Sequence, residues 1–177
     1  MADIAAWAWI ALALVFPAVL IVAAVTDVIS FTIPNALSIV LAGAFLVLAP
    51  IAGLSLNETL FHALAGLATL GLGFGLFLLN VVGGGDVKLL AATAVWTGWP
   101  HLGPFLLAVA LAGGLVAAAL IVARRVARRA PVDPTTRWGR LMSPKEGVPY
   151  GVAIAIAGIV VAPRLPIAAH VLEMFAS

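Results

Sequence analysis

The feature that most constrains this chain is its series of apolar runs, all but one of which contain no charged residue. The first run, Ile4 to Val25, is 22 residues long, and a helix needs about 20 apolar residues to cross the hydrocarbon core of a bilayer. Five further apolar runs follow: Ala36 to Gly53, Ala63 to Val82, Val87 to Trp99, Pro104 to Ala123 and Val148 to Ala162. The sequence therefore predicts an all-α fold, a polytopic membrane helix bundle with about six transmembrane helices.

Composition supports this prediction and excludes other classes of protein. Of the 177 residues, 64% are hydrophobic and only 9% are charged, whereas about 25% of the residues of a soluble domain are charged. So few charges exclude a water-soluble enzyme and a disordered chain. Cysteine is absent from the sequence, which excludes disulfides, a thiol nucleophile and a zinc–thiolate site. We expect a single membrane-embedded domain over residues 1–177, in which the short fourth and sixth runs are the least certain to cross fully.

The basic residues predict how the chain is oriented in the membrane. Seven of the nine Lys and Arg residues lie between the fifth and sixth spans, in a loop at 124–147. The positive-inside rule places this loop in the cytoplasm, and six spans then put both termini outside. The segments 26–35 and 83–88 fall on the cytoplasmic side. Anchoring against anionic lipid explains the clustered charge without a nucleic-acid partner, and substrate contact is an added possibility.

Acidic residues within or beside membrane spans are candidates for function, because charge is costly there. Five of the seven acids have ordinary positions at the termini, in an outer loop or in the basic loop: Asp3, Glu58, Asp133, Glu146 and Glu173. The other two, Asp27 and Asp86, each stand alone at the cytoplasmic end of a span. Separately, Asp27 could be an interfacial residue facing water and Asp86 a helix N-cap. Together they can form an aspartic dyad that shares one proton and activates a water molecule.

The segments next to Asp27 and Asp86 predict that the backbone turns tightly after Asp27 and that other chain segments can come close to Asp86. Pro34 suits the first turn of a helix, so the chain re-enters the membrane soon after Asp27. Three glycines, 83–85, end the third span and remove side-chain bulk next to Asp86, so that a neighbouring helix or an extended peptide can come near. Lys88 has the ordinary explanation of reaching toward lipid headgroups.

Histidines and tryptophans are expected at the membrane interfaces. Three histidines fall on the outer face, away from both aspartates: His62, His101 and His170. We therefore predict no metal site and no cofactor. Four tryptophans are predicted in an interfacial aromatic belt: Trp7, Trp96, Trp99 and Trp138.

Three motifs in this order carry a resemblance to a known family. Asp27 is followed by Ile33-Pro34-Asn35, then by Gly-Gly-Gly-Asp-Val-Lys-Leu-Leu at 83–90, and finally by Val-Pro-Tyr-Gly-Val-Ala at 148–153. With six spans, this arrangement resembles the type IV prepilin peptidases, GxGD aspartic proteases of the inner membrane. It is similar in particular to their small single-module branch, which serves Flp-type (tight adherence) pili. The resemblance covers nearly the whole chain.

The resemblance implies a function and a set of site residues. Asp27 and Asp86 would be the catalytic pair, cleaving the basic leader of a Flp-type prepilin or pseudopilin at the cytoplasmic face of the inner membrane. Lys88 would contact an acidic residue early in the mature part of that substrate. The residues that would shape the site or bind substrate are Pro34, Asn35, Gly83, Gly85, Lys88, Pro149, Tyr150 and Gly151.

The sequence also departs from the family in two respects. Larger members have an N-terminal cytoplasmic domain, often with a tetracysteine zinc site, and N-methylate the new terminus. Because this chain has no cysteine and no room for such a domain before its first span, we do not expect methyltransferase activity. The stretch 28–32 lacks the Arg or Lys that relatives often carry there.

The sequence is also compatible with two other classes of function. Asp27 and Asp86 could bind protons or cations in a small transporter or channel subunit, since glycine-broken helices also mark transport sites. Against this, both acids sit at one edge of the membrane and the sequence shows no internal repeat. A non-catalytic pilus or secretion assembly protein would tolerate the loss of both aspartates.

Overall fold

The structure is a computed structural model that describes residues 2–127, 136–143 and 147–165 together with residues 168 and 171. Within these residues the chain is helical and contains no strand. The elements are α1 (Ala2–Ser30), α2 (Asn35–Ile51), α3 (Leu56–Leu78), α4 (Gly84–Ala127), α5 (Arg137–Met142) and α6 (Tyr150–Val161), followed by the 3-10 helix η1 (Ala162–Arg164). The predicted all-α membrane bundle is confirmed.

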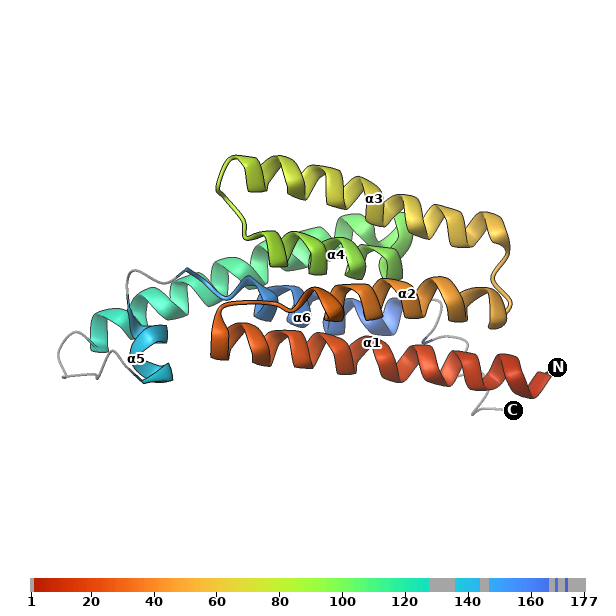
Figure 1. Ribbon diagram of the computed structural model, residues 1–177, viewed down its shortest axis with the longest axis horizontal. Helices are drawn as coiled ribbons and strands as arrows, with labels where there is room; N and C mark the ends of the chain where they lie inside the picture. Colours follow the sequence, from red (N-terminus) through yellow and green to blue (C-terminus); the bar gives the residue numbers. More distant parts are fainter. Residues whose placement is uncertain (1, 128–135, 144–146, 166–167, 169–170, 172–177) are drawn as a thin grey trace.

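Helix α4 consists of two limbs joined at a sharp break. Gly98 has φ 57° and ψ −179°, which is not helical geometry, and Figure 1 shows that the chain reverses direction there and runs back along the bundle. We call residues 84–97 the first limb and residues 99–127 the second limb. They correspond to the predicted fourth and fifth spans. By length and composition α1, α3 and the whole of α4 are long and apolar enough to cross a membrane, while α2 and the segment from Tyr150 to Arg164 are shorter apolar helices.

A histidine from α3 packs against this break. The ring of His62 lies over Gly98, where an added Cβ would come within 2.7 Å of the histidine Cε1. Its Nδ1 lies 2.7 Å from the Val95 carbonyl oxygen, and the ring stacks on Phe45 with centroids 4.7 Å apart. Because a carbonyl can only accept, the Nδ1–H donates this hydrogen bond. His62 therefore has a packing role at the break, whereas His170 lies outside the described residues.

Two short helical segments, the first limb of α4 and helix α6, form the centre of the bundle. The first limb of α4 is buried along most of its length, and α6 is buried on most of its faces. At 1.5 Å per residue, the 14 residues of the first limb reach only about 21 Å, less than the roughly 30 Å of a bilayer core. This short helix suffices because other helices of the protein, rather than lipid, surround it. The long helices α1 and α3 expose large apolar side chains instead.

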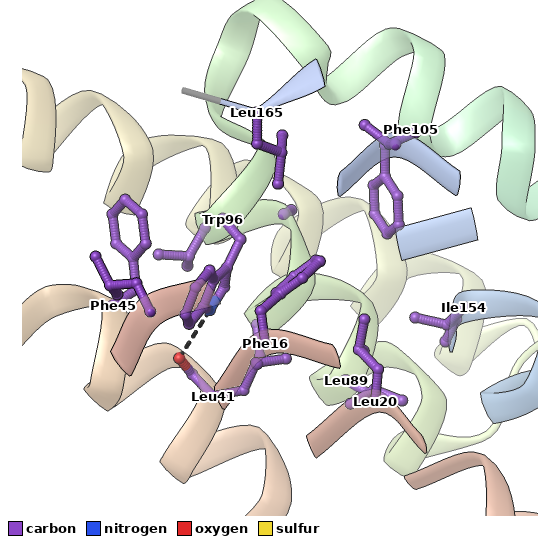
Figure 2. Close-up of a cluster of buried hydrophobic side chains, with 14 of the residues drawn as sticks. Phe16, Leu20, Leu41, Phe45, Leu89, Trp96, Phe105, Ile154 and Leu165 are labelled. Atoms are coloured by element: carbon purple, nitrogen blue, oxygen red, sulfur yellow. Dashed lines mark hydrogen bonds between the residues drawn. The ribbon is translucent and has the colours of Figure 1, made fainter. Parts of the chain in front are cut away.

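The core cluster in Figure 2 joins four helices around one tryptophan. Trp96, in the first limb, is fully buried, and its indole Nε1–H donates a 2.9 Å hydrogen bond to the Leu41 carbonyl oxygen of α2. Phe16 and Phe45 pack against its ring at centroid distances of 4.8 and 5.4 Å. The prediction that Trp96 belongs to an interfacial belt is wrong. The other three tryptophans of that prediction are exposed: Trp7, Trp99 and Trp138.

Several helix boundaries differ from those predicted, and two of the differences concern acidic residues. Helix α3 begins at Leu56 rather than at residue 63, because Ser55 and Glu58 form a capping box in which each side chain binds the other residue's backbone N–H. Glu58, predicted in an outer loop, therefore lies in the first turn of α3. Helix α1 continues to Ser30 rather than ending near Val25, which places Asp27 in its last helical stretch.

One end of the bundle gathers the segments that were predicted to be cytoplasmic. Figure 1 shows the end of α1, the turn at 31–34, the loop at 79–83 and helix α5 at the same end, opposite the start of α1. We call this the aspartate end, because Asp27 and Asp86 lie there. The predicted basic loop 124–147 is only partly among the described residues, since 128–135 and 144–146 lie outside them.

Arg124 attaches the described part of that loop to the rest of the bundle. Arg124, near the end of α4, donates from Nε to the Leu141 carbonyl oxygen at 3.1 Å and from Nη2 to the Gly147 carbonyl oxygen at 3.0 Å. Leu141 belongs to α5, and Gly147 precedes α6. The arginine side chain therefore fixes α5 beside the aspartate end.

Candidate active site

A cavity of about 300 Å³ lies at the aspartate end, between the end of α1 and the start of α4. It is lined by Asp27, Phe31, Thr32, Ile33, Asn35, Gly83, Gly84, Gly85 and Asp86. The two acids that the sequence singled out therefore face one cavity, and they are close enough to interact electrostatically.

Asp27 is held by the start of a distant helix. Its side chain is 4% exposed, and Oδ2 accepts a 2.7 Å hydrogen bond from the backbone N–H of Gly151. Gly151 is the second residue of α6, and the first N–H groups of a helix have no carbonyl partner within the helix. The start of α6 thus uses one of these free N–H groups to fix the carboxylate.

Position 151 also has to be a glycine for this contact. An added Cβ would lie 2.8 Å from Asp27 Oδ2 and 2.9 Å from Ile33 Cδ1. Both distances are too short for a side chain to be accommodated without movement of its neighbours. The glycine of the Pro-Tyr-Gly motif therefore allows α6 to approach the aspartate and the turn after α1 at once.

Asp86 lies on the opposite wall, next to the glycine run. It is the third residue of α4, so it does not occupy the N-cap position considered from the sequence. An added Cβ on Gly83 would lie 2.9 Å from Asp86 Oδ2, and one on Gly85 would lie 3.4 Å from Ile33 Cβ. The glycines therefore leave room for the carboxylate and for the turn that follows α1. This agrees with the bulk-removing role predicted for the run.

The turn at 31–34 forms the third wall, and its backbone is unusual. Phe31 has φ 53°, in the left-handed region that residues with a side chain seldom adopt. Its N–H donates a 2.8 Å hydrogen bond to the Asp27 carbonyl oxygen, which ends α1. The guanidinium carbon of Arg140 lies 5.7 Å from the centroid of the Phe31 ring. Helix α5 thus contacts a residue of the cavity wall through a cation–π interaction.

Lys88 contacts another side chain of the protein. Its Nζ donates a 2.9 Å hydrogen bond to Asn35 Oδ1, which joins the start of α2 to the first limb of α4. Asn35 lines the cavity, whereas Lys88 does not. Reaching toward lipid headgroups is therefore not the whole role of this lysine.

The structure brings some of the predicted site residues together and leaves others outside. Those that line the cavity or bind a lining residue directly are Asp27, Asn35, Gly83, Gly85, Asp86, Lys88 and Gly151. Pro34 and Pro149 instead occupy the N-cap positions of α2 and α6. The Tyr150 ring packs on Gly113 of the second limb, where an added Cβ would lie 3.1 Å from its Cε1.

Sequence reasoning missed four lining residues and one contact. The missed lining residues are Phe31, Thr32, Ile33 and Gly84, and the missed contact is that of Arg140 with Phe31. Apolar residues of a short turn look the same whether they face a cavity or lipid. For Phe31 and Thr32 the available signal was their place between Asp27 and the Ile-Pro-Asn motif, whereas Ile33 belongs to that motif and Gly84 to the glycine run.

Comparison with known families now decides the class of protein. The model of the type IV leader peptidase family matches residues 14–118, which is more than half of the chain and includes both aspartates. The chain belongs to the type IV leader peptidase family. As a member of this leader peptidase family it is a peptidase, and the family implies a prepilin substrate. Comparisons with curated proteins and with solved structures found no match.

Two carboxylates line the cavity of this leader peptidase. Among the described residues, no group of three His, Asp or Glu side chains is arranged to hold a metal ion. The cavity instead offers one carboxylate held by a backbone N–H, a second carboxylate beside a glycine run, and polar lining from Thr32 and Asn35. Such a pair can activate water and protonate a leaving group.

Proposed function

We propose that this member of the leader peptidase family is an aspartic endopeptidase that removes the N-terminal leader from type IV, Flp-like prepilins. The reaction takes place at the cytoplasmic face of the bacterial inner membrane, and Asp27 and Asp86 are its catalytic residues. The observation that carries the proposal is that both carboxylates line one cavity at the aspartate end. No other acid of the described residues lines it.

The two carboxylates divide the acid and base work. One takes a proton from a water molecule as its oxygen attacks the carbonyl carbon of the scissile peptide bond. The other, protonated, donates a hydrogen bond to the carbonyl oxygen, and a proton then passes to the leaving amine as the C–N bond breaks. Two adjacent carboxyl groups that share one proton are suited to this exchange. The Gly151 N–H holds Asp27 in place for it.

The other predicted site residues support the pair. Gly83 and Gly85 leave space for an extended substrate backbone beside Asp86, and Asn35 and Lys88 offer polar contacts at the edge of the cavity. The other three predicted site residues position helices rather than contact the substrate. Pro34 starts α2 next to Asn35, Pro149 starts α6 next to Gly151, and Tyr150 packs α6 on the second limb.

The orientation follows the positive-inside rule. The basic loop 124–147 lies in the cytoplasm, the leader of the substrate reaches the aspartates from that side, and both termini lie outside. Residues 1–177 act as one membrane-embedded peptidase domain. Arg124 and Arg140 support this placement, because they attach the described part of the basic loop to the aspartate end.

Co-expression with a Flp-type prepilin tests the proposal. We expect the wild-type chain to shift the pilin to its mature size, and Asp27→Asn and Asp86→Asn each to abolish that shift while membrane insertion is unchanged. Glu58→Gln is the control, because Glu58 lies in a capping box at the other end of the bundle and glutamine can replace glutamate there. Normal processing by either aspartate variant would refute the dyad, and a wild-type chain without any shift would favour the transporter.

A further inference from the structure

A second cavity opens on the side of the bundle, between α2 and α3. Its volume is about 550 Å³, its floor is the first limb of α4, and we call it the lateral groove. Representative wall residues are Ile39, Ala42 and Leu46 of α2 with Leu67 and Leu70 of α3. Ile39 and Leu67 are 70% and 62% exposed, so the groove opens at the surface of the bundle, where lipid would surround it.

The lateral groove leads to the candidate active site. Asn35 lines both the groove and the cavity that holds Asp27 and Asp86. From Asn35 to Leu46 the groove follows 12 residues of α2, a rise of roughly 16 Å or three helical turns. A chain segment lying in the groove would therefore have one end at the aspartates and the rest within the membrane.

Polar groups gather at the active-site end of this groove. Lys88 and Asn35 lie there, joined by their hydrogen bond. One turn further along α2, the Ser38 hydroxyl is buried, and it has no hydrogen-bond partner within the described part of the chain. A buried hydroxyl without a partner is costly, and rotation of the Ser38 side chain toward the groove would let a ligand with a backbone carbonyl or polar side chain satisfy it. Beyond Ser38 the lining is apolar on both walls.

A substrate with a polar leader followed by an apolar helix shows the same change from polar to apolar along its length. A substrate whose leader emerges at the membrane surface must place its scissile bond at the aspartates while the following apolar helix stays in the bilayer. Small residues on the walls, such as Ala42 and Ala63, let a helix approach closely, as at helix contacts in membranes. An acyl chain would satisfy the apolar walls but offers no donor or acceptor to Ser38 at that depth.

We propose that the lateral groove between α2 and α3 binds the apolar helix of the prepilin substrate and guides the scissile bond to Asp27 and Asp86. This inference rests on the proposed function. It adds that α2 contributes to substrate specificity outside the catalytic cavity, because it contacts the apolar helix of the substrate. It also adds that the substrate enters sideways from the bilayer.

Cysteine cross-linking tests the position of the substrate helix, since the chain has no cysteine of its own. Ile39→Cys places a thiol on the groove wall, and Val40→Cys places one at nearly the same depth on a different face of α2. Both native residues are exposed and β-branched, so the pair is matched. Each is combined with Asp86→Asn, which keeps a Flp-type prepilin uncut, and the prepilin carries one cysteine in its apolar helix. We expect cross-links from position 39 to exceed those from position 40 several-fold.

Filling the groove provides a second readout that separates a bound helix from bound lipid. We expect Ile39→Trp to lower kcat/KM for the full prepilin by about tenfold and Val40→Trp to change it by less than about twofold. Cleavage of a leader peptide that lacks the apolar helix should be the same for both. Equal cross-linking at positions 39 and 40 would overturn the groove assignment, and so would normal cleavage of the full prepilin by Ile39→Trp. In either case, cleavage by the wild-type chain would still support the proposed function. Absence of wild-type cleavage overturns both.

Discussion

The backbone N–H of Gly151 donates a 2.7 Å hydrogen bond to Oδ2 of Asp27, although 124 positions separate the two residues in the chain. This contact couples the start of α6 to the last part of α1. It also gives the Pro-Tyr-Gly motif a physical role that its position in the sequence does not reveal. The motif supplies the donor that orients a carboxylate, rather than a side chain that reacts.

Gly151→Ala should therefore impair cleavage without preventing insertion. The new Cβ would lie 2.8 Å from Asp27 Oδ2 and 2.9 Å from Ile33 Cδ1, so the carboxylate has to move. A displacement of about 1 Å can cost 10²-fold in rate, and we expect a loss of about 10- to 100-fold in kcat/KM for prepilin cleavage. Gly147→Ala is the matched control, because an added Cβ there meets nothing within 4 Å. Equal activity of the two variants would contradict the positioning role.

Gly98→Ala should lower the stability of the fold. Gly98 has φ 57°, and an added Cβ would meet the His62 ring at 2.7 Å, so both backbone and packing are strained. Strain of this kind costs about 1–3 kcal/mol, measurable as a lower Tm or earlier denaturation in detergent micelles. Gly103→Ala, in an open helical position of the second limb, should instead be neutral or stabilise by up to about 1 kcal/mol. If both variants unfold alike, the break does not depend on glycine.

His62→Phe tests the hydrogen bond at the same break. Phenylalanine keeps a ring to stack on Phe45 but cannot donate to the Val95 carbonyl oxygen. A buried acceptor left without its partner costs about 1–3 kcal/mol, so we expect reduced stability by denaturation in micelles. Cleavage measured at a temperature where the variant is folded should be nearly normal, because His62 lies far from the aspartate end. A variant as stable as the wild type would show that the hydrogen bond contributes nothing.

Arg140→Ala should reduce activity modestly through Phe31. The cation–π interaction at 5.7 Å is worth about 0.5–1 kcal/mol at an exposed site, which corresponds to roughly a two- to fivefold loss of kcat/KM. Arg125→Ala, on the exposed end of α4, controls for the loss of one positive charge. In a Phe31→Leu background, Arg140→Ala should cause a smaller loss than in the wild type, since the cation–π interaction is already gone. Additive losses in the double variant would place the effect of Arg140 elsewhere.

Several features of the fold and site could be predicted from the chain alone. The order of six apolar runs matches α1, α2, α3, the two limbs of α4 and α6. The choice of Asp27 and Asp86 rested on the scarcity of charge, and the structure places both in one cavity. Trp96 shows the limit of such reasoning. A tryptophan near the end of a short apolar run looks interfacial, and only the surrounding helices make it a core residue.

The sequence by itself determined that the chain forms helices in a membrane and where they begin and end to within about seven residues. This is because a bilayer requires each backbone polar group to be satisfied within its own segment. Only the tertiary structure decided which helices are central and which distant groups meet. Helices that are apolar on every face carry no periodic signal that distinguishes a buried face from a lipid-facing one. The contacts of Lys88 with Asn35 and of Gly151 with Asp27 span 53 and 124 positions, so they depend on packing that no local pattern records.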